Sequence, residues 1–91
     1  MDEVNEGGAE LSTGAGRAGV SERRRRYVGS RITHLREDCG LSLEELARRV
    51  GLLAGVMKAV ESGRRGVAFE CLIDIANELG VTASELVDGM E

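Results

Sequence analysis

Proline and tryptophan are missing from this chain of 91 residues, and its aromatic side chains are limited to Tyr27 and Phe69. A core built on aromatic packing is therefore excluded. Leucine, isoleucine, valine and alanine have to supply the buried surface of one small domain. Wherever the apolar residues recur regularly, their spacing is helical. The sequence therefore predicts an all-α fold.

Cysteine and histidine are scarce. Cys39 and Cys71 are too few for a disulfide scaffold, and no secretory signal or membrane-spanning apolar run is present. We expect two free thiols, buried or half-buried, in a reducing cytoplasm, and no membrane association. A metal site could in principle form from His34, Cys39 and Cys71. Three ligands at such loose spacing are a weak signal, and ordinary free thiols are the more frequent state of such cysteines. We expect no metal and no other cofactor.

A catalytic constellation is also missing. His34 is the single histidine, and no nucleophile, glycine-rich phosphate loop or carboxylate pair is arranged around it. A histidine on a helix surface usually has no role beyond contact with solvent. We therefore expect that the protein is not an enzyme.

Positive charge is concentrated in the middle of the chain, although the net charge is −4. Residues 1–16 carry four acids and no base, and residues 66–91 carry six acids and no base. All twelve lysines and arginines fall in residues 17–65, where six acids leave a balance of +6. This distribution indicates a polyanionic partner better than the total charge does.

The N-terminal segment, residues 1–20, is acidic, rich in glycine and without periodicity, so we expect a disordered tail ahead of a domain over residues 21–91. Four arginines follow at residues 23–26, where the first helix should begin. Positive charge there opposes the helix macrodipole. We favour a flexible arm that follows a phosphate backbone or enters a minor groove; the alternative is a solvated flank.

Residues 40–63 are the stretch around which the chain is organised. Two apolar stripes at helical spacing, over residues 43–50 and 52–60, flank Gly51. Glycine suits a tight turn there because it reaches left-handed backbone conformations at little cost. Ala47 faces the turn and is small enough for the two helices to cross closely. The arrangement is typical of a helix-turn-helix, with a plain helical hairpin as the alternative.

Capping signals set the limits of the helices. Ser42 with Glu45, and Thr82 with Glu85, are predicted capping boxes, whereas no capping side chain stands near Leu53. The expected helices span about 22–39, 42–50, 53–62, 68–79 and 83–88. The predicted core residues of the first and fourth of these are Val28, Ile32, Leu35, Cys39, Phe69, Leu72, Ile73, Ile75, Ala76 and Leu79.

Several spaced motifs carry a family resemblance. They are IxxLRExxGLSxEELA at residues 32–47, Val50-Gly51, the stretch Met57…Val60-Glu61-x-Gly63, and LIDIANELGVTASEL at residues 72–86. In these motifs the chain resembles the Cro/repressor-type (xenobiotic-response-element, XRE) helix-turn-helix family over roughly residues 28–88. Its SGRR…IANELGV section is also similar to controller proteins of restriction–modification systems. The resemblance implies a compact five-helix bundle of the lambda-repressor type, which binds double-stranded DNA as a homodimer with its third helix in the major groove.

The resemblance also assigns residues. Those that would face bases are Leu53, Ala54, Gly55, Lys58, Ala59 and Ser62. Those that would form the two-fold contact are Val81, Leu86, Val87 and Met90, whose alternative role is to cap the core. Phosphate contacts are expected from Arg23, Arg24, Arg25, Arg26, Arg48, Arg49, Lys58, Arg64 and Arg65. Family members usually carry several polar side chains on the base-reading face, whereas Ala and Gly can at most touch a thymine methyl group.

Two functions remain open at this point. The first is a DNA-binding transcriptional regulator whose affinity comes mainly from phosphate contacts, with specificity from Lys58, the arginine arm and DNA shape. The second is a helix-turn-helix fold that acts as a protein-interaction module. Its partner, another copy, a transcription factor or a polymerase subunit, would bind exposed Leu53, Val56 and Met57.

Overall fold

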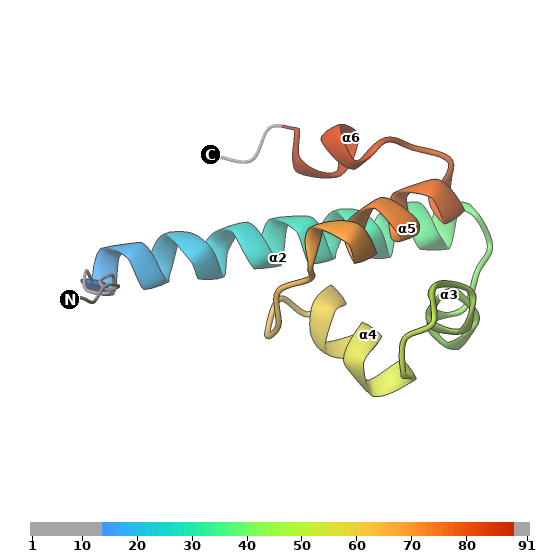
Figure 1. The fold of residues 1–91 in the computed structure, drawn as a ribbon, viewed down its shortest axis with the longest axis horizontal. Helices are drawn as coiled ribbons and strands as arrows, with labels where there is room; N and C mark the ends of the chain where they lie inside the picture. Colours follow the sequence, from blue (N-terminus) through green and yellow to red (C-terminus); the bar gives the residue numbers. More distant parts are fainter. Residues whose placement is uncertain (1–13, 89–91) are drawn as a thin grey trace.

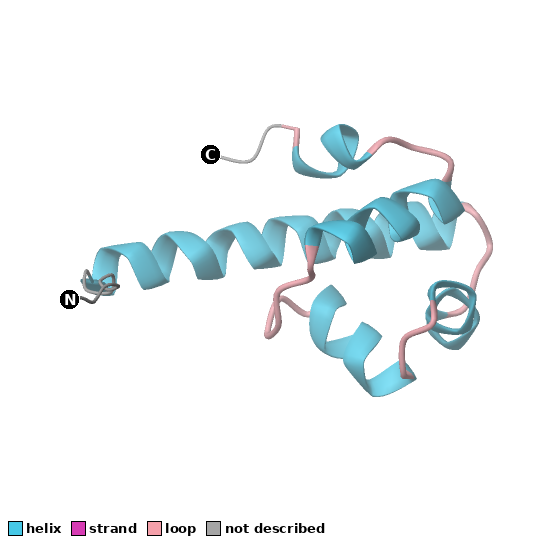
Figure 2. Cartoon of the chain, in the orientation of Figure 1, coloured by secondary structure: helices cyan, strands magenta, loops and turns pink. Residues whose placement is uncertain are grey.

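The computed structural model describes residues 14–88, with side chains from Glu22 onward. This part of the chain contains α2 (Gly14–Asp38), α3 (Leu43–Val50), α4 (Ala54–Glu61), α5 (Phe69–Leu79) and α6 (Ala83–Val87), and no strand (Figure 2). The prediction of an all-α fold with five helices is confirmed. The bounds of the last four helices differ from the expected ranges by one residue at most.

The long helix α2 forms the axis of the fold (Figure 1). Helix α5 runs beside it, α3 and α4 lie together on one side of this pair, and α6 lies on the other side. The N-terminal half of α2 extends beyond the other helices. As a result, α4 has only α2 and α3 as its main neighbours, and its outer face meets no other helix of the described chain.

The N-terminal region differs from the expected one in two respects. Helix α2 begins at Gly14 rather than near residue 22, so residues 14–20 of the predicted tail are helical, and residues 23–26 lie inside this helix rather than in a flexible arm. Extending an existing helix costs far less than starting one, and arginine is a good helix former. The earlier start also places the arginines more than two turns from the N-terminus, beyond the reach of the macrodipole. The rest of the tail, residues 1–13, lies outside the described residues.

The helix-turn-helix consists of α3, its turn and α4, as predicted. Gly51 ends α3 in the left-handed conformation with a φ angle of 76°. The backbone N–H of Leu52 donates to the carbonyl of Ala47 (2.8 Å), and Ala47 itself is buried. Leu53 then starts α4 without any hydrogen bond from a capping side chain.

One of the two predicted capping boxes is complete. Thr82 Oγ1 accepts from the N–H of Glu85 (3.1 Å), and the Glu85 carboxylate accepts from the N–H of Thr82 (3.1 Å). At α3 only half of the box forms: Ser42 Oγ accepts from the N–H of Glu45 (3.0 Å). The Glu45 carboxylate accepts instead from Arg49 (3.0 Å), because an arginine one helical turn further on competes for it.

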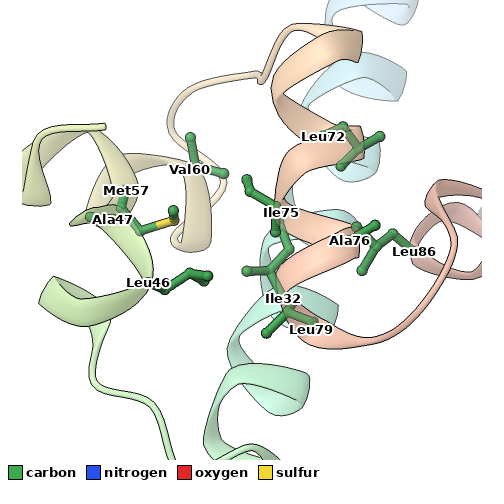
Figure 3. Close-up of a cluster of buried hydrophobic side chains, with 10 residues drawn as sticks. All are labelled: Ile32, Leu46, Ala47, Met57, Val60, Leu72, Ile75, Ala76, Leu79 and Leu86. Carbon is green, nitrogen blue, oxygen red and sulfur yellow. The ribbon is translucent and has the colours of Figure 1, made fainter. Parts of the chain in front are cut away.

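The core is aliphatic and draws on all five helices (Figure 3). Its buried side chains are Ile32, Leu46, Ala47, Met57, Val60, Leu72, Ile75, Ala76, Leu79 and Leu86. Met57 and Val60 turn the inner face of α4 toward Leu46 of α3 and toward α5 (Figure 3). The core therefore fixes which face of α4 remains outside.

Three predicted core residues are exposed. Phe69 is 70% exposed and Ile73 is 37% exposed. The buried stripe of α5 is centred on Leu72, Ile75, Ala76 and Leu79, and Ile73 points about 100° away from Leu72 because consecutive helical residues turn by that angle. Phe69 stands at the edge of that stripe in the first turn. Cys39 is exposed because α2 ends at Asp38, which leaves the thiol in the following turn.

Candidate nucleic-acid interface

The outer face of α4 presents the residues expected to face bases. Leu53, Ala54, Gly55, Lys58 and Ser62 are exposed, and Ala59 is half-buried. The alternation with buried Met57 and Val60 follows from the helical period, with one face in the core and the other in solvent. The structure therefore brings the predicted base-facing residues together on one surface, which we call the α4 face.

The α4 face has even fewer side chains free to form hydrogen bonds with base edges than its sequence indicates. The Ser62 hydroxyl donates to the carbonyl of Ala59 (3.1 Å) and accepts from Arg64 Nε (3.1 Å). Its single proton is thus already used within the chain. Lys58 forms no salt bridge with any carboxylate of residues 22–88. Lys58 is therefore the one long polar side chain that the described α4 face offers to a partner.

The apolar patch required by the protein-interaction hypothesis is not formed as predicted. Met57 is completely buried and Val56 is half-buried, so Leu53, which is 78% exposed, is the remaining large apolar side chain there. The side chain of Met57 belongs to the buried core cluster (Figure 3). A single leucine is far smaller than the extended apolar patches that mark protein partners.

The expected phosphate-binding arginines differ in how far they are engaged within the chain. Arg49 is held by Glu45 (3.0 Å) and Glu78 (3.5 Å), which raise its pKa, the hydrogen bond to Glu45 being the largest cause. Arg26 pairs with Glu22 (3.1 Å). Arg48 lies 3.8 Å from Glu45 and is 72% exposed, so that contact restrains it little.

Arginines from distant parts of the sequence meet beside the C-terminal end of α4. Arg24 and Arg25 of α2 and Arg65 of the following loop line one open hollow of about 190 Å³. Arg25 is held in place because its Nε donates to the carbonyl of Gly63 (3.3 Å). Consecutive helical residues point in different directions, so only part of the run at residues 23–26 can face this loop. We call these three side chains the arginine cluster.

A largely buried ion pair connects α4 to α2, and the sequence analysis missed it. Arg36 Nε and Nη2 donate to the two carboxylate oxygens of Glu61 (2.7 and 3.0 Å), and the side chains are only 12% and 7% exposed. Thr33 Oγ1 lies 2.9 Å from Glu61, and Arg36 Nη1 donates to the carbonyl of Leu41 (2.9 Å). The hydrogen bond to Glu61 raises the pKa of Arg36. No local spacing pairs these residues, which are far apart in the sequence.

The two cysteines and the histidine do not come together in a binding site. Cys39 and Cys71 are free thiols, and His34 is exposed on α2. Burial raises the pKa of Cys71, and the charge of Asp74 adds to the effect. Residues 14–88 contain no cluster of ligands suited to a metal ion and no helix long and apolar enough to cross a membrane.

Residues 28–88 match the family described as a helix-turn-helix domain, which is most of the part of the chain that the structure describes. This chain belongs to that helix-turn-helix family. The match runs from the middle of α2 to the end of α6, so it covers the whole bundle and not the turn alone. The family favours the DNA-binding interpretation over the protein-interaction alternative.

Relatives of this helix-turn-helix protein are regulators. The uncharacterized HTH-type transcriptional regulator y4dJ of Sinorhizobium fredii is 38% identical over 63 residues, which are 69% of this chain and 82% of the relative. The restriction–modification controller C.AhdI of Aeromonas hydrophila is 32% identical, with a TM-score of 0.63 over 76% of this chain and 97% of that one. The clp gene regulator ClgR of Corynebacterium glutamicum is 29% identical, with a TM-score of 0.66 over 68% of this chain and 66% of ClgR. The resemblance to Cro/repressor-type proteins and controller proteins is confirmed.

Proposed function

We propose that this protein binds double-stranded operator DNA with the α4 face in the major groove and thereby regulates transcription in the cytoplasm. The observation that supports this most is the shape of the α4 face. It is a helix surface that no other described helix covers, on which the small residues Ala54, Gly55 and Ala59 accompany the exposed Lys58. A helix of this width fits the major groove, and small side chains allow its backbone to approach the base edges closely.

Phosphate contacts supply most of the affinity in this proposal. Arg48 lies in the last turn of α3, ahead of α4, and the arginine cluster lies beside the C-terminal end of α4. In this proposal they bind phosphates on either side of the groove that α4 enters. Arg49 is left out of the proposed contacts because Glu45 and Glu78 already neutralise it.

The test is the salt dependence of DNA binding. The logarithm of the association constant is expected to fall with the logarithm of salt concentration, by roughly 0.9 for each phosphate contacted. Replacing Arg65→Gln is expected to reduce this slope by about 0.9 per copy, since one phosphate contact is lost. Fluorescence anisotropy with a duplex selected from random sequences, at several salt concentrations, measures both slopes.

The matched control is Arg49→Gln, which removes the same charge from a side chain that carboxylates already hold. It is expected to leave the slope nearly unchanged. Binding that hardly responds to salt, or equal slopes for Arg65→Gln and the unaltered protein, would contradict the proposed role of the arginine cluster.

We also propose that the protein acts as a homodimer, with a contact that differs from the predicted one. Leu86 is completely buried in the core, so it cannot form a contact between copies. Val81 and Val87 are half-buried against the core, and Met90 lies outside the described residues. The large apolar side chains exposed on α5 are Phe69 and Ile73, one turn apart, and they are the surface that we propose for the two-fold contact.

Sedimentation equilibrium is expected to show a dimer that dissociates on dilution. Phe69→Ser with Ile73→Ser is expected to shift the equilibrium to monomer without loss of folding, because both side chains are outside the core. A protein that stays monomeric at high concentration, or a dimer unaffected by the double substitution, would contradict this contact.

A further inference from the structure

Leu53 is an unusual residue for its place. It is 78% exposed, the most exposed of the large apolar side chains among the residues with described side chains, and it stands at the N-cap of α4. Apart from Ile73, the other leucine, isoleucine and valine side chains of residues 22–88 are buried or half-buried. The N-cap position itself gains nothing from leucine, which has no group to accept the orphan amide hydrogens. Leu53 therefore has no evident role in folding.

The two residues after Leu53 are as small as residues can be. Ala54 ends in a methyl group, and Gly55 has no side chain. A Cβ atom placed on Gly55 would have no neighbour within 4 Å, so glycine is not required there by packing within the chain. Glycine in a helix also costs about 1 kcal/mol relative to alanine. Both residues let the first turn of α4 approach a flat or grooved surface closely, with Leu53 projecting ahead of it.

We infer that Leu53 is a specificity-determining residue that recognises thymine by its C5-methyl group in the major groove, with Ala54 completing the apolar contact. This inference rests on the proposed DNA-binding function. The thymine methyl is the apolar feature that the major groove presents, and apolar side chains are the groups that read it. Hydrogen-bond readout by the first turn of α4 is excluded, because Leu53, Ala54 and Gly55 have no polar side-chain atoms.

The chemistry gives a direct experiment, since deoxyuridine differs from thymidine only by this methyl group. A duplex selected from random sequences is compared with the same duplex carrying deoxyuridine in place of thymidine in each half-site. The protein is expected to bind the deoxyuridine duplex roughly fourfold more weakly for each methyl group in contact. Anisotropy at a fixed salt concentration measures the ratio of the two affinities.

Leu53→Ala identifies the side chain responsible. The ratio is expected to fall to about one, whereas the unfolding midpoint is expected to stay unchanged because the side chain is exposed. Glu70→Ala is the control: it truncates another exposed side chain to alanine, on α5 and outside both the α4 face and the proposed two-fold contact, and is expected to keep the ratio. This comparison also removes any effect of deoxyuridine on the shape of the duplex, since that effect is common to both variants.

The outcomes separate this inference from the function on which it rests. Equal affinity for the two duplexes, or a ratio that survives Leu53→Ala, would overturn the recognition of thymine methyl groups and leave DNA binding standing. Failure to bind any duplex, even at low salt, would overturn both.

Discussion

Gly29→Ala is expected to destabilise the protein by about 2–3 kcal/mol, although it adds only one methyl group in the middle of a helix. Gly29 lies where α2 crosses the end of α4. A Cβ atom there would clash with the carbonyl oxygen of Val60 and would lie 2.5 Å from that of Glu61. These are backbone atoms, so no side-chain rotation can relieve the clash, and α2 and α4 have to separate. Urea unfolding followed by circular dichroism measures the loss.

Gly55→Ala is the matched control for this prediction. It makes the same chemical change in a helix, at a position where the added Cβ atom has no neighbour within 4 Å. We expect it to stabilise the protein by roughly 1 kcal/mol, the difference in helix propensity between the two residues. If both substitutions changed stability in the same direction, the close crossing of α2 and α4 would not be the cause.

Glu61→Gln is expected to destabilise the protein by about 2–3 kcal/mol, because it leaves the largely buried Arg36 guanidinium without its counter-charge. Arg36 bonds both carboxylate oxygens of Glu61, and it also reaches the carbonyl of Leu41 ahead of α3. The pair therefore holds three segments in place, including the last residue of α4. Urea unfolding of the variant and of the unaltered protein gives the difference in free energy.

Two variants test whether burial is the reason. Glu22→Gln breaks the ion pair between Glu22 and Arg26, in which both side chains are more than half exposed. It is expected to lower the free energy of unfolding by less than about 1 kcal/mol. Arg36→Met combined with Glu61→Leu removes both buried charges and is expected to recover most of the loss caused by Glu61→Gln. A loss from Glu61→Gln no larger than that from Glu22→Gln would contradict the buried ion pair.

These two predictions concern the position of α4 rather than its surface. Gly29 allows α4 to approach α2 closely, and the Arg36–Glu61 pair connects the last residue of α4 to α2. Both therefore affect the orientation of the α4 face, although Gly29, Arg36 and Glu61 do not lie on it. Neither contact was predicted, because each joins residues that are widely separated in the sequence.

The sequence alone was sufficient for features that depend on neighbouring residues. The turn at Gly51 follows from the conformational freedom of glycine, and the cap at Thr82 follows from a hydroxyl three residues before a glutamate. The apolar stripes follow from the helical period, which is why the helix-turn-helix and the family were predictable, whereas the complete burial of Met57 was not. Each of these patterns can be recognised within a short stretch of the sequence.

Only the tertiary structure decided which residues of the same chemical type are buried, paired or exposed. Leu86 and Phe69 are both apolar residues on helices, yet one is fully buried and the other is exposed, because burial depends on where the neighbouring helices end. Three arginines of equal charge differ in their surroundings. Arg36 is largely buried and paired with Glu61, Arg49 is paired with two glutamates, and Arg65 belongs to the arginine cluster. Composition and spacing specify the charge of a side chain, whereas its partners are set by segments that meet only when the chain folds.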